Sequence, residues 1–84
     1  MPTVTVRLFA QAREAVGQAR LRRELPTEGR SLSEELAGMA RDYPKLAAVL
    51  PRCRFARNGE FVDPATARLA GGDDIAVHPP YSGG

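Results

Sequence analysis

The residues best suited to chemistry are the last four of the chain, Tyr81-Ser82-Gly83-Gly84. They follow Pro79-Pro80, and because neither proline can donate a ladder hydrogen bond, we expect the chain to leave its domain extended there. The final glycines remove every side chain beyond Ser82, so this flexible end could thread a tunnel too narrow for a β-carbon. The terminal carboxylate of Gly84 would then be presented inside the active site of another protein.

A carboxylate is an unreactive acyl group at neutral pH, so this terminus requires activation. The simplest route is attack of the carboxylate on the α-phosphate of ATP, which gives an acyl-adenylate from which sulfur or another nucleophile displaces AMP. The chain has no glycine motif with the spacing of a P-loop or a dinucleotide-binding turn. We therefore expect no cofactor bound by this chain, ATP bound by an activating partner, and no catalysis by the chain alone.

Other reactive residue types give weaker patterns. Ser82, His78 and either Asp73 or Asp74 supply the groups of a catalytic triad, but a flexible tail cannot hold nucleophile and base within reach. A single histidine and a single cysteine, Cys53, exclude both an internal disulfide and a structural zinc site, so we expect no metal. His78 is interpreted as a strand residue available for contact, and Cys53 as a small buried residue in a strand.

The composition limits the chain to one small domain. Eighty-four residues with 43% hydrophobic and 6% aromatic side chains cannot enclose a deep pocket above a complete core. The net charge is +2, and the arginines do not alternate with aromatics, so nucleic-acid binding is not indicated. Arg7 and Arg13 interrupt the N-terminal segment, and no stretch approaches the length of a membrane span. These features predict a cytoplasmic protein without a membrane partner.

The elements that must hold the tail begin with an alternating strand over Thr3–Phe9, in which Val4, Val6 and Leu8 share one face. A short helix is predicted over residues 10–17, ending at Gly17, and a second strand over residues 19–25.

The main helix is predicted to start at Ser31, where Ser31 and Glu34 fit a capping box, and to stop before Pro44. Its apolar stripe, taken as the main core element, comprises Leu32, Leu36, Met39, Ala40 and Tyr43. A further helical turn is expected over residues 46–50.

The last part of the domain is predicted to be a hairpin and one strand. Asn58-Gly59 favours a tight turn between strands at residues 53–57 and 60–62. A glycine turn then leads into a last strand at residues 75–78. One substantial helix over a small mixed sheet is typical of the ubiquitin-like β-grasp, an α+β fold, over residues 1–80, with 81–84 as a tail. The pattern alone leaves a ferredoxin-like α+β sandwich open.

The sequence resembles the family of small, sulfur-carrier subunits of molybdopterin synthase. The resemblance rests on the segments 8–17 (LFAQAREAVG), 69–73 (LAGGD) and 79–84 (PPYSGG), in that order and spacing. It implies a β-grasp fold and a Gly84 carboxylate that an E1-like enzyme adenylates and a sulfur donor, a sulfurtransferase, converts to a thiocarboxylate. The large synthase subunit would then receive the tail and pass its sulfur to cyclic pyranopterin monophosphate.

The same resemblance implies that the catalytic residues lie on the large subunit, with residues Pro79, Pro80, Tyr81, Ser82 and Gly83 threading into its active site. Phe9, Phe61 and His78 would contribute to an apolar docking surface. The sequence departs from the family at two of these positions: the family usually has an apolar or aromatic residue in place of His78, and a small aliphatic one in place of Tyr81. Both departures affect partner contact and leave the Gly-Gly chemistry intact.

Three alternatives remain open on the sequence. A related carrier could supply sulfur for thiamine or for tRNA thiolation, although the helix at residues 10–17 favours the synthase subunit. A ubiquitin-like modifier conjugated to lysines would use the same terminus. A plain β-grasp interaction module would have no use for Gly83 and Gly84.

Overall fold

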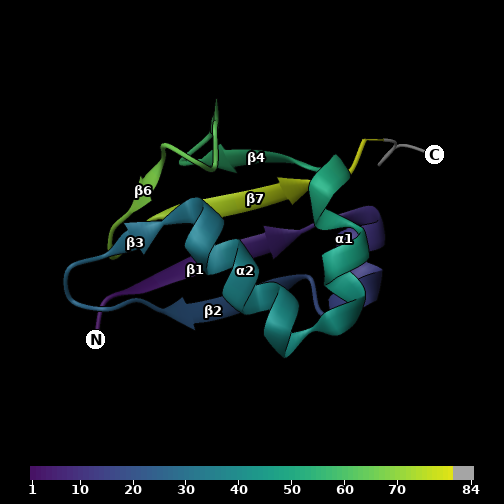
Figure 1. The fold of residues 1–84 in the computed structure, drawn as a ribbon, viewed down its shortest axis with the longest axis horizontal. Coiled ribbons are helices and arrows are strands. Elements are labelled where there is room, and N and C mark those ends of the chain that lie inside the picture. Colours follow the sequence, from purple (N-terminus) through teal and green to yellow (C-terminus); the bar gives the residue numbers. More distant parts are fainter. Residues whose placement is uncertain (81–84) are drawn as a thin grey trace.

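A five-stranded mixed sheet organises the fold of residues 1–80, the part of the chain that the computed structural model describes (Figure 1). The order of its strands is β2-β1-β7-β4-β5, with β1 and β7 parallel at the centre and every other neighbouring pair antiparallel. The strands are β1 (Thr3–Leu8), β2 (Arg20–Glu24), β4 (Arg54–Arg57), β5 (Glu60–Val62) and β7 (Asp74–His78).

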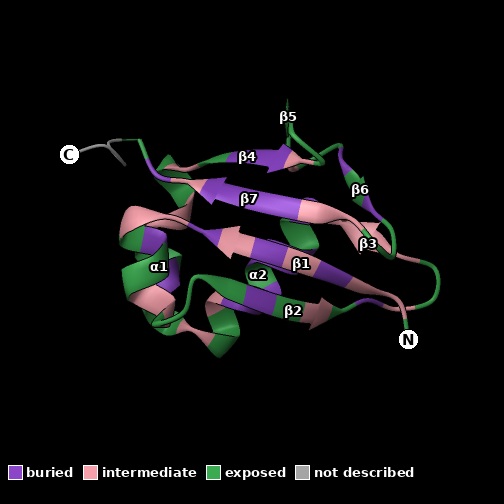
Figure 2. Ribbon diagram, turned by 180° about the vertical axis from the view of Figure 1, so that it is seen from behind, coloured by how far each residue is buried: buried purple, intermediate pink, exposed green. Residues whose placement is uncertain are grey.

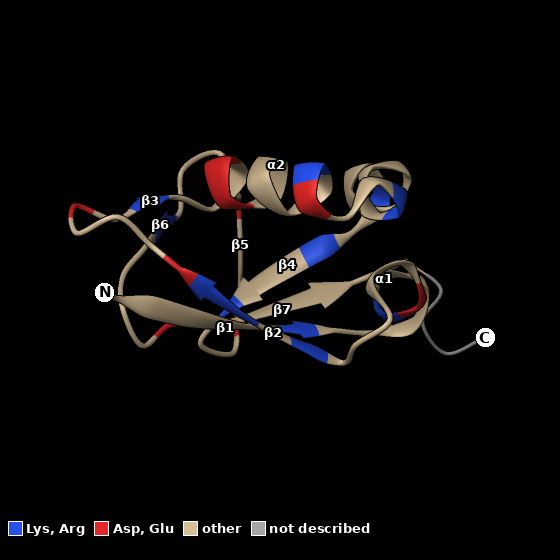
Figure 3. Cartoon of the chain, turned by 90° about the horizontal axis from the view of Figure 1, so that it is seen from below, with Lys and Arg blue, Asp and Glu red and all other residues tan. Residues whose placement is uncertain are grey.

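The main helix, α2 (Leu32–Asp42), packs on one face of this sheet, as the edge-on view of Figure 3 shows. The shorter α1 (Ala10–Val16) lies at the end of the sheet where β1 and β7 finish (Figure 1). Two 3₁₀ segments, η1 (Pro44–Ala48) and η2 (Leu50–Arg52), return the chain from α2 to β4. The arrangement confirms the predicted β-grasp with one substantial helix.

The capping box predicted at the start of α2 is present. The hydroxyl of Ser31 accepts a hydrogen bond from the Glu34 amide at 3.1 Å, and the Glu34 carboxylate accepts one from the Ser31 amide at 3.0 Å. Two amides that the first helical turn leaves without partners are therefore satisfied.

The predicted hairpin is also present, because its two turn residues adopt the backbone that a tight β4–β5 turn requires. Asn58 has φ of 51° and Gly59 has φ of 87°. The Asn58 side chain then fastens the turn to the neighbouring strand: its oxygen accepts from the Asp74 amide at 2.9 Å, and its nitrogen donates to Asp73 at 3.0 Å.

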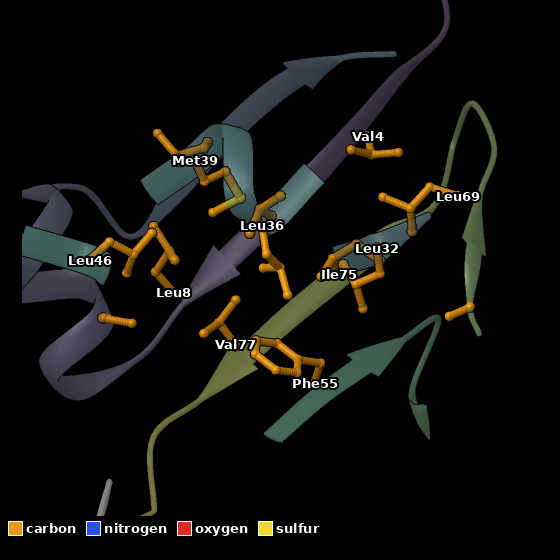
Figure 4. Close-up of a cluster of buried hydrophobic side chains, with 14 of the residues drawn as sticks. Val4, Leu8, Leu32, Leu36, Met39, Leu46, Phe55, Leu69, Ile75 and Val77 are labelled. Atoms are coloured by element: carbon orange, nitrogen blue, oxygen red, sulfur yellow. The ribbon is translucent and has the colours of Figure 1, made fainter. Parts of the chain in front are cut away.

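The hydrophobic core fills the space between α2 and the inner face of the sheet (Figures 2 and 4). Fully burying an aliphatic side chain of this kind contributes about 2 kcal/mol, so these residues supply most of the driving force for folding. The largest contributors with under a tenth of their surface exposed are Val4, Val6, Leu8, Leu21, Leu25, Leu32, Leu36, Met39, Leu46, Phe55, Leu69, Ile75 and Val77.

Several element boundaries differ from the sequence-based expectation. Phe9 does not extend β1 but caps α1 with extended backbone, and Ala19, expected to begin the second strand, precedes β2 and is exposed. Cys53, expected in a strand, precedes β4 and is half-buried. The expected helical turn after Pro44 is formed by the two 3₁₀ segments instead.

A second, two-stranded sheet was not predicted. It pairs β3 (Arg30–Ser31) with β6 (Arg68–Leu69) in antiparallel register. Two-residue strands are too short to show an alternating pattern, so only the folded chain brings them together.

Candidate functional site

The face of the main sheet that α2 leaves uncovered brings together three of the predicted site residues, Phe9, His78 and Phe61. The strand register explains this meeting. Leu8 pairs with Val77, so the next residues along the two parallel strands, Phe9 and His78, become neighbours on the outer face. Phe61 comes from β5, two strands away from β7, and lies diagonally across from His78. We call these three side chains the aromatic strip.

The three rings of the aromatic strip are in contact. The Phe9 and His78 rings stack in parallel, with centroids 4.8 Å apart and planes 5° apart. Phe61 meets His78 edge-on, with centroids 5.9 Å apart and planes at 64°. Both geometries are favoured between aromatic rings. Phe61 keeps 58% of its surface exposed, which is uncommon for a large apolar side chain on a small protein and marks a contact surface.

An arginine stands at each end of the aromatic strip. The Arg54 guanidinium carbon lies 4.1 Å above the centre of the Phe61 ring, and that of Arg7 lies 5.9 Å from Phe9. Arg7 also forms an ion pair with Asp74, at 2.7 Å between guanidinium nitrogen and carboxylate oxygen. Sequence reasoning missed both arginines, although their positions in alternating strands place them on the same face as the rings.

The root of the tail directly follows the aromatic strip. Pro79, the residue after His78, is buried, whereas Pro80 is exposed. Both prolines line a hollow of about 210 Å³ together with Gln11, Ala48, Val49 and Arg52. The predicted tail residues Tyr81, Ser82, Gly83 and Gly84 lie outside the described part of the chain. The described part therefore fixes the point of exit, at the end of the sheet beside α1 (Figure 1).

The other reactive residue types are used for structure within the described residues. Asp73 accepts hydrogen bonds from the Ala70 amide and from Asn58, and Asp74 is held by Arg7. Burial raises the pKa of the Cys53 thiol, whose sulfur donates to the Val49 carbonyl at 3.3 Å. Residues 1–80 contain no group of three His, Cys, Asp or Glu side chains able to hold a metal ion. No helix in the same range is long and apolar enough to cross a membrane.

Comparison with known sequences extends the likeness over nearly the whole chain. A family model described as the ThiS family matches residues 6–84. The molybdopterin synthase sulfur carrier subunit of Chlamydomonas reinhardtii is 37% identical over 82 residues, covering 96% of this chain and 98% of the relative. The subunit of the same name from Aedes aegypti is 36% identical over 86 residues, covering 96% and 88%.

Solved structures also match this chain over nearly its whole length. The small archaeal modifier protein 1 of Methanosarcina acetivorans superposes with a TM-score of 0.79 at 28% identity, over 100% of this chain and 98% of that one. A Helicobacter pylori chain, solved in a complex of subunits 1 and 2 of molybdopterin-converting factor, gives 0.70 at 26% identity over 98% and 99%. These likenesses confirm the predicted fold and the resemblance on which it was partly based. The chain belongs to the ThiS family.

Proposed function

We propose that this chain is the sulfur-carrier subunit of a molybdopterin synthase and that Gly84 is the residue that carries the sulfur. The observation that supports this most strongly is the position of the aromatic strip. His78 belongs to the strip and lies two residues before the exposed Pro80, so a partner that covers the strip also holds the root of the tail. The curated relatives that match almost end to end carry the name of sulfur carrier subunits.

The proposed chemistry proceeds in two activation steps on an E1-like partner. A carboxylate oxygen of Gly84 attacks the α-phosphorus of ATP, and pyrophosphate leaves with the electron pair of the broken P–O bond. Sulfide, released from a sulfurtransferase persulfide by a thiol reductant, then attacks the acyl carbon, and AMP leaves. The product is a thiocarboxylate in which one oxygen of the Gly84 carboxylate has been replaced by sulfur.

Delivery of the sulfur is proposed to occur in the large subunit of the synthase. The aromatic strip docks on that subunit, and the residues from Pro80 onward enter its active site. There the thiocarboxylate sulfur bonds to a carbon of cyclic pyranopterin monophosphate and displaces an oxygen substituent, and water then cleaves the acyl–sulfur bond, which leaves the sulfur on the pterin and returns the Gly84 carboxylate. Pro79 is buried, so we assign it to the domain surface that aims the tail, and the inserting segment begins at Pro80. A fixed exit point raises the effective concentration of the terminus in that site.

The direct test is intact-mass measurement after incubation with the E1-like enzyme, ATP and sulfide. The wild-type chain should gain the mass difference of one oxygen replaced by sulfur. A variant with one alanine added after Gly84 should keep the wild-type melting temperature and remain unmodified. An unchanged wild-type mass with an enzyme that activates another carrier would refute the proposal.

A second candidate function is conjugation to proteins, supported by the likeness to the small archaeal modifier protein 1. Both functions begin with adenylation of Gly84, so the two are distinguished after that step. Incubation with a cell extract and ATP should yield an isopeptide between Gly84 and a lysine if the chain is a modifier. A carrier should instead return to the free carboxylate after giving its sulfur to the pterin substrate.

A further inference from the structure

We infer that the outer face of the main sheet, around the aromatic strip, binds a partner surface that carries carboxylates opposite Arg20, Arg22 and Arg54. The inference rests on the proposed function, because it names the chemistry of the surface that receives the aromatic strip. It goes beyond apolar docking, because it proposes that the positive charges on β2 and β4 help to select the partner.

The charges of the outer face are predominantly positive. Four arginines occupy outward positions on β1, β2 and β4, and two carboxylates share the same face. The arginines are Arg7, Arg20, Arg22 and Arg54, and the carboxylates are Glu24 and Asp74. Asp74 is already bound to Arg7, so it does not neutralise the others. Within residues 1–80, Arg20, Arg22 and Arg54 take part in no salt bridge, and all three are exposed.

Neither arginine on the outer face of β2 faces a carboxylate across the β1–β2 pair. Arg20 lies opposite Arg7, whose carboxylate partner is Asp74, and Arg22 lies opposite Thr5. On the inner face of β2 the charge is paired, because Arg23 forms ion pairs with Glu35 and Asp42. The outer face of β2 thus leaves two exposed positive charges available to a partner, whereas the inner face does not.

The guanidinium of Arg54 is held in a position from which it could bind a carboxylate of a partner. Its guanidinium lies over the Phe61 ring at 4.1 Å, and its strand position is directly opposite His78. A guanidinium held over an aromatic ring by a cation–π contact can still bind a carboxylate with two hydrogen bonds. The aromatic strip and Arg54 thus offer adjoining apolar and charged contacts.

The middle of the outer face carries two small side chains between the arginines of β1 and β2 and the Phe61 ring. Ala56 and Ala76 pair across β4 and β7, and Arg7 is the residue of β1 that lies opposite Ala76. In the same row of residues across the sheet, Arg7 and then Arg20 follow on the side of Ala76, and Phe61 follows on the side of Ala56. This shape fits a partner with an apolar centre bordered by aspartate or glutamate residues.

The test measures association of the full-length chain with the purified large synthase subunit by stopped flow. Raising the salt from about 0.05 M to 0.5 M should slow wild-type association about tenfold, because steering by exposed charges is screened. The double variant Arg20→Glu, Arg22→Glu should associate about tenfold more slowly at low salt, and Arg54→Lys should dissociate several-fold faster. The matched control is Arg41→Glu, Lys45→Glu, which changes net charge equally on the helix-bearing side.

The outcomes separate this inference from the proposed function. Equal slowing by both double variants, or a salt-independent wild-type rate, would overturn the carboxylate-bearing partner while leaving the carrier function intact. If the wild-type chain does not bind the large subunit at any salt concentration, the docking face and the synthase function both fail. Melting curves of each variant show that altered rates do not come from unfolding.

Discussion

At the residue scale, Phe61 and Cys53 show how exposure separates a contact residue from a structural one. Phe61 is exposed but fixed on both sides, by the His78 ring and by the Arg54 guanidinium. A large side chain that is held in place before binding loses little conformational entropy when a partner covers it. Cys53, the chain's single thiol, is half-buried against the core and bonded to a backbone carbonyl.

Replacing Phe61 with alanine should weaken docking without weakening the fold. Because the ring is 58% exposed, Phe61→Ala should change the free energy of unfolding by less than about 0.5 kcal/mol. An aromatic anchor at the centre of an interface contributes about 2 kcal/mol, so the Kd for the large subunit should rise roughly thirtyfold. Isothermal titration and urea unfolding check the two effects. Arg41→Ala, on the helix side, should leave both unchanged.

Cys53 should make the fold more sensitive to alkaline pH. Burial raises the pKa of its thiol above the unfolded value, so its contribution to stability is complete below that value. The contribution is lost as the pH rises through the folded pKa, because the unfolded thiol ionises first. The difference in urea midpoint between the wild-type chain and Cys53→Ala should therefore shift in favour of the variant between pH 7 and pH 10. A difference that stays constant across this range would contradict the assignment.

At the element scale, the start of α2 depends on two side chains whose roles were visible in the sequence. Hydrogen bonds from the backbone amide and hydroxyl of Ser31 hold the pKa of Glu34 below its usual value. The helix in turn places Leu32, Leu36 and Met39 on the sheet. The hairpin likewise followed from Asn58-Gly59, because a turn with two positive φ angles admits few residue types.

Removal of the capping hydroxyl should destabilise the fold in a pH-dependent way. Ser31→Ala should lower the free energy of unfolding by about 1 kcal/mol at pH 7. Because the folded pKa of Glu34 is lowered, its contribution is present above the unfolded pKa and lost as the pH falls through the folded one. Urea titrations should therefore show the wild-type advantage shrinking below about pH 4. The control is Ser33→Ala, because Ser33 is two residues further along and exposed. It should lower the free energy of unfolding less than Ser31→Ala does.

At the scale of the whole molecule, a buried ion cluster joins the helix layer to the sheet. Glu35 on α2 is only 1% exposed, and its carboxylate contacts Arg23 of β2 at 2.5 Å and Arg30 of β3 at 3.3 Å. Burial alone would lower the pKa of Arg23, but its hydrogen bonds to Glu35 and Asp42 outweigh that effect and raise it. The cluster fixes how α2 crosses the sheet, opposite the face that carries the aromatic strip.

Removing Arg23 should lower the free energy of unfolding more than removing Glu35. Arg23→Met leaves the Glu35 carboxylate buried with only its 3.3 Å contact to Arg30, so it should cost about 3 kcal/mol of stability. Glu35→Met should cost less, because Arg23 is 19% exposed and keeps Asp42 as a partner. Urea unfolding of both variants measures the difference. Equal losses, or a larger loss for Glu35→Met, would show that the buried carboxylate is not the costly charge.

Local patterns in the sequence were enough for those parts of the fold that neighbouring residues impose on each other. The alternation of β1, the capping box of Ser31, the Asn58-Gly59 turn and the fold class were all predicted, and the Gly-Gly end suggested the chemistry that we propose. Aromatic residues at positions 9 and 61 were singled out through a family resemblance, since nothing in their spacing links them.

Contacts between distant residues arose only on folding, because they depend on strand order and register. The parallel pairing of β1 with β7 stacks Phe9 on His78, and β5 then adds Phe61 from the sheet edge. Strand register also groups on the uncovered face arginines that take part in no salt bridge within residues 1–80. The packing of α2 on the sheet buries Glu35 against Arg23, where sequence reasoning would place both charges in water. Periodicity assigns a side chain to a face, whereas its neighbours on that face are set by long-range hydrogen bonding between strands.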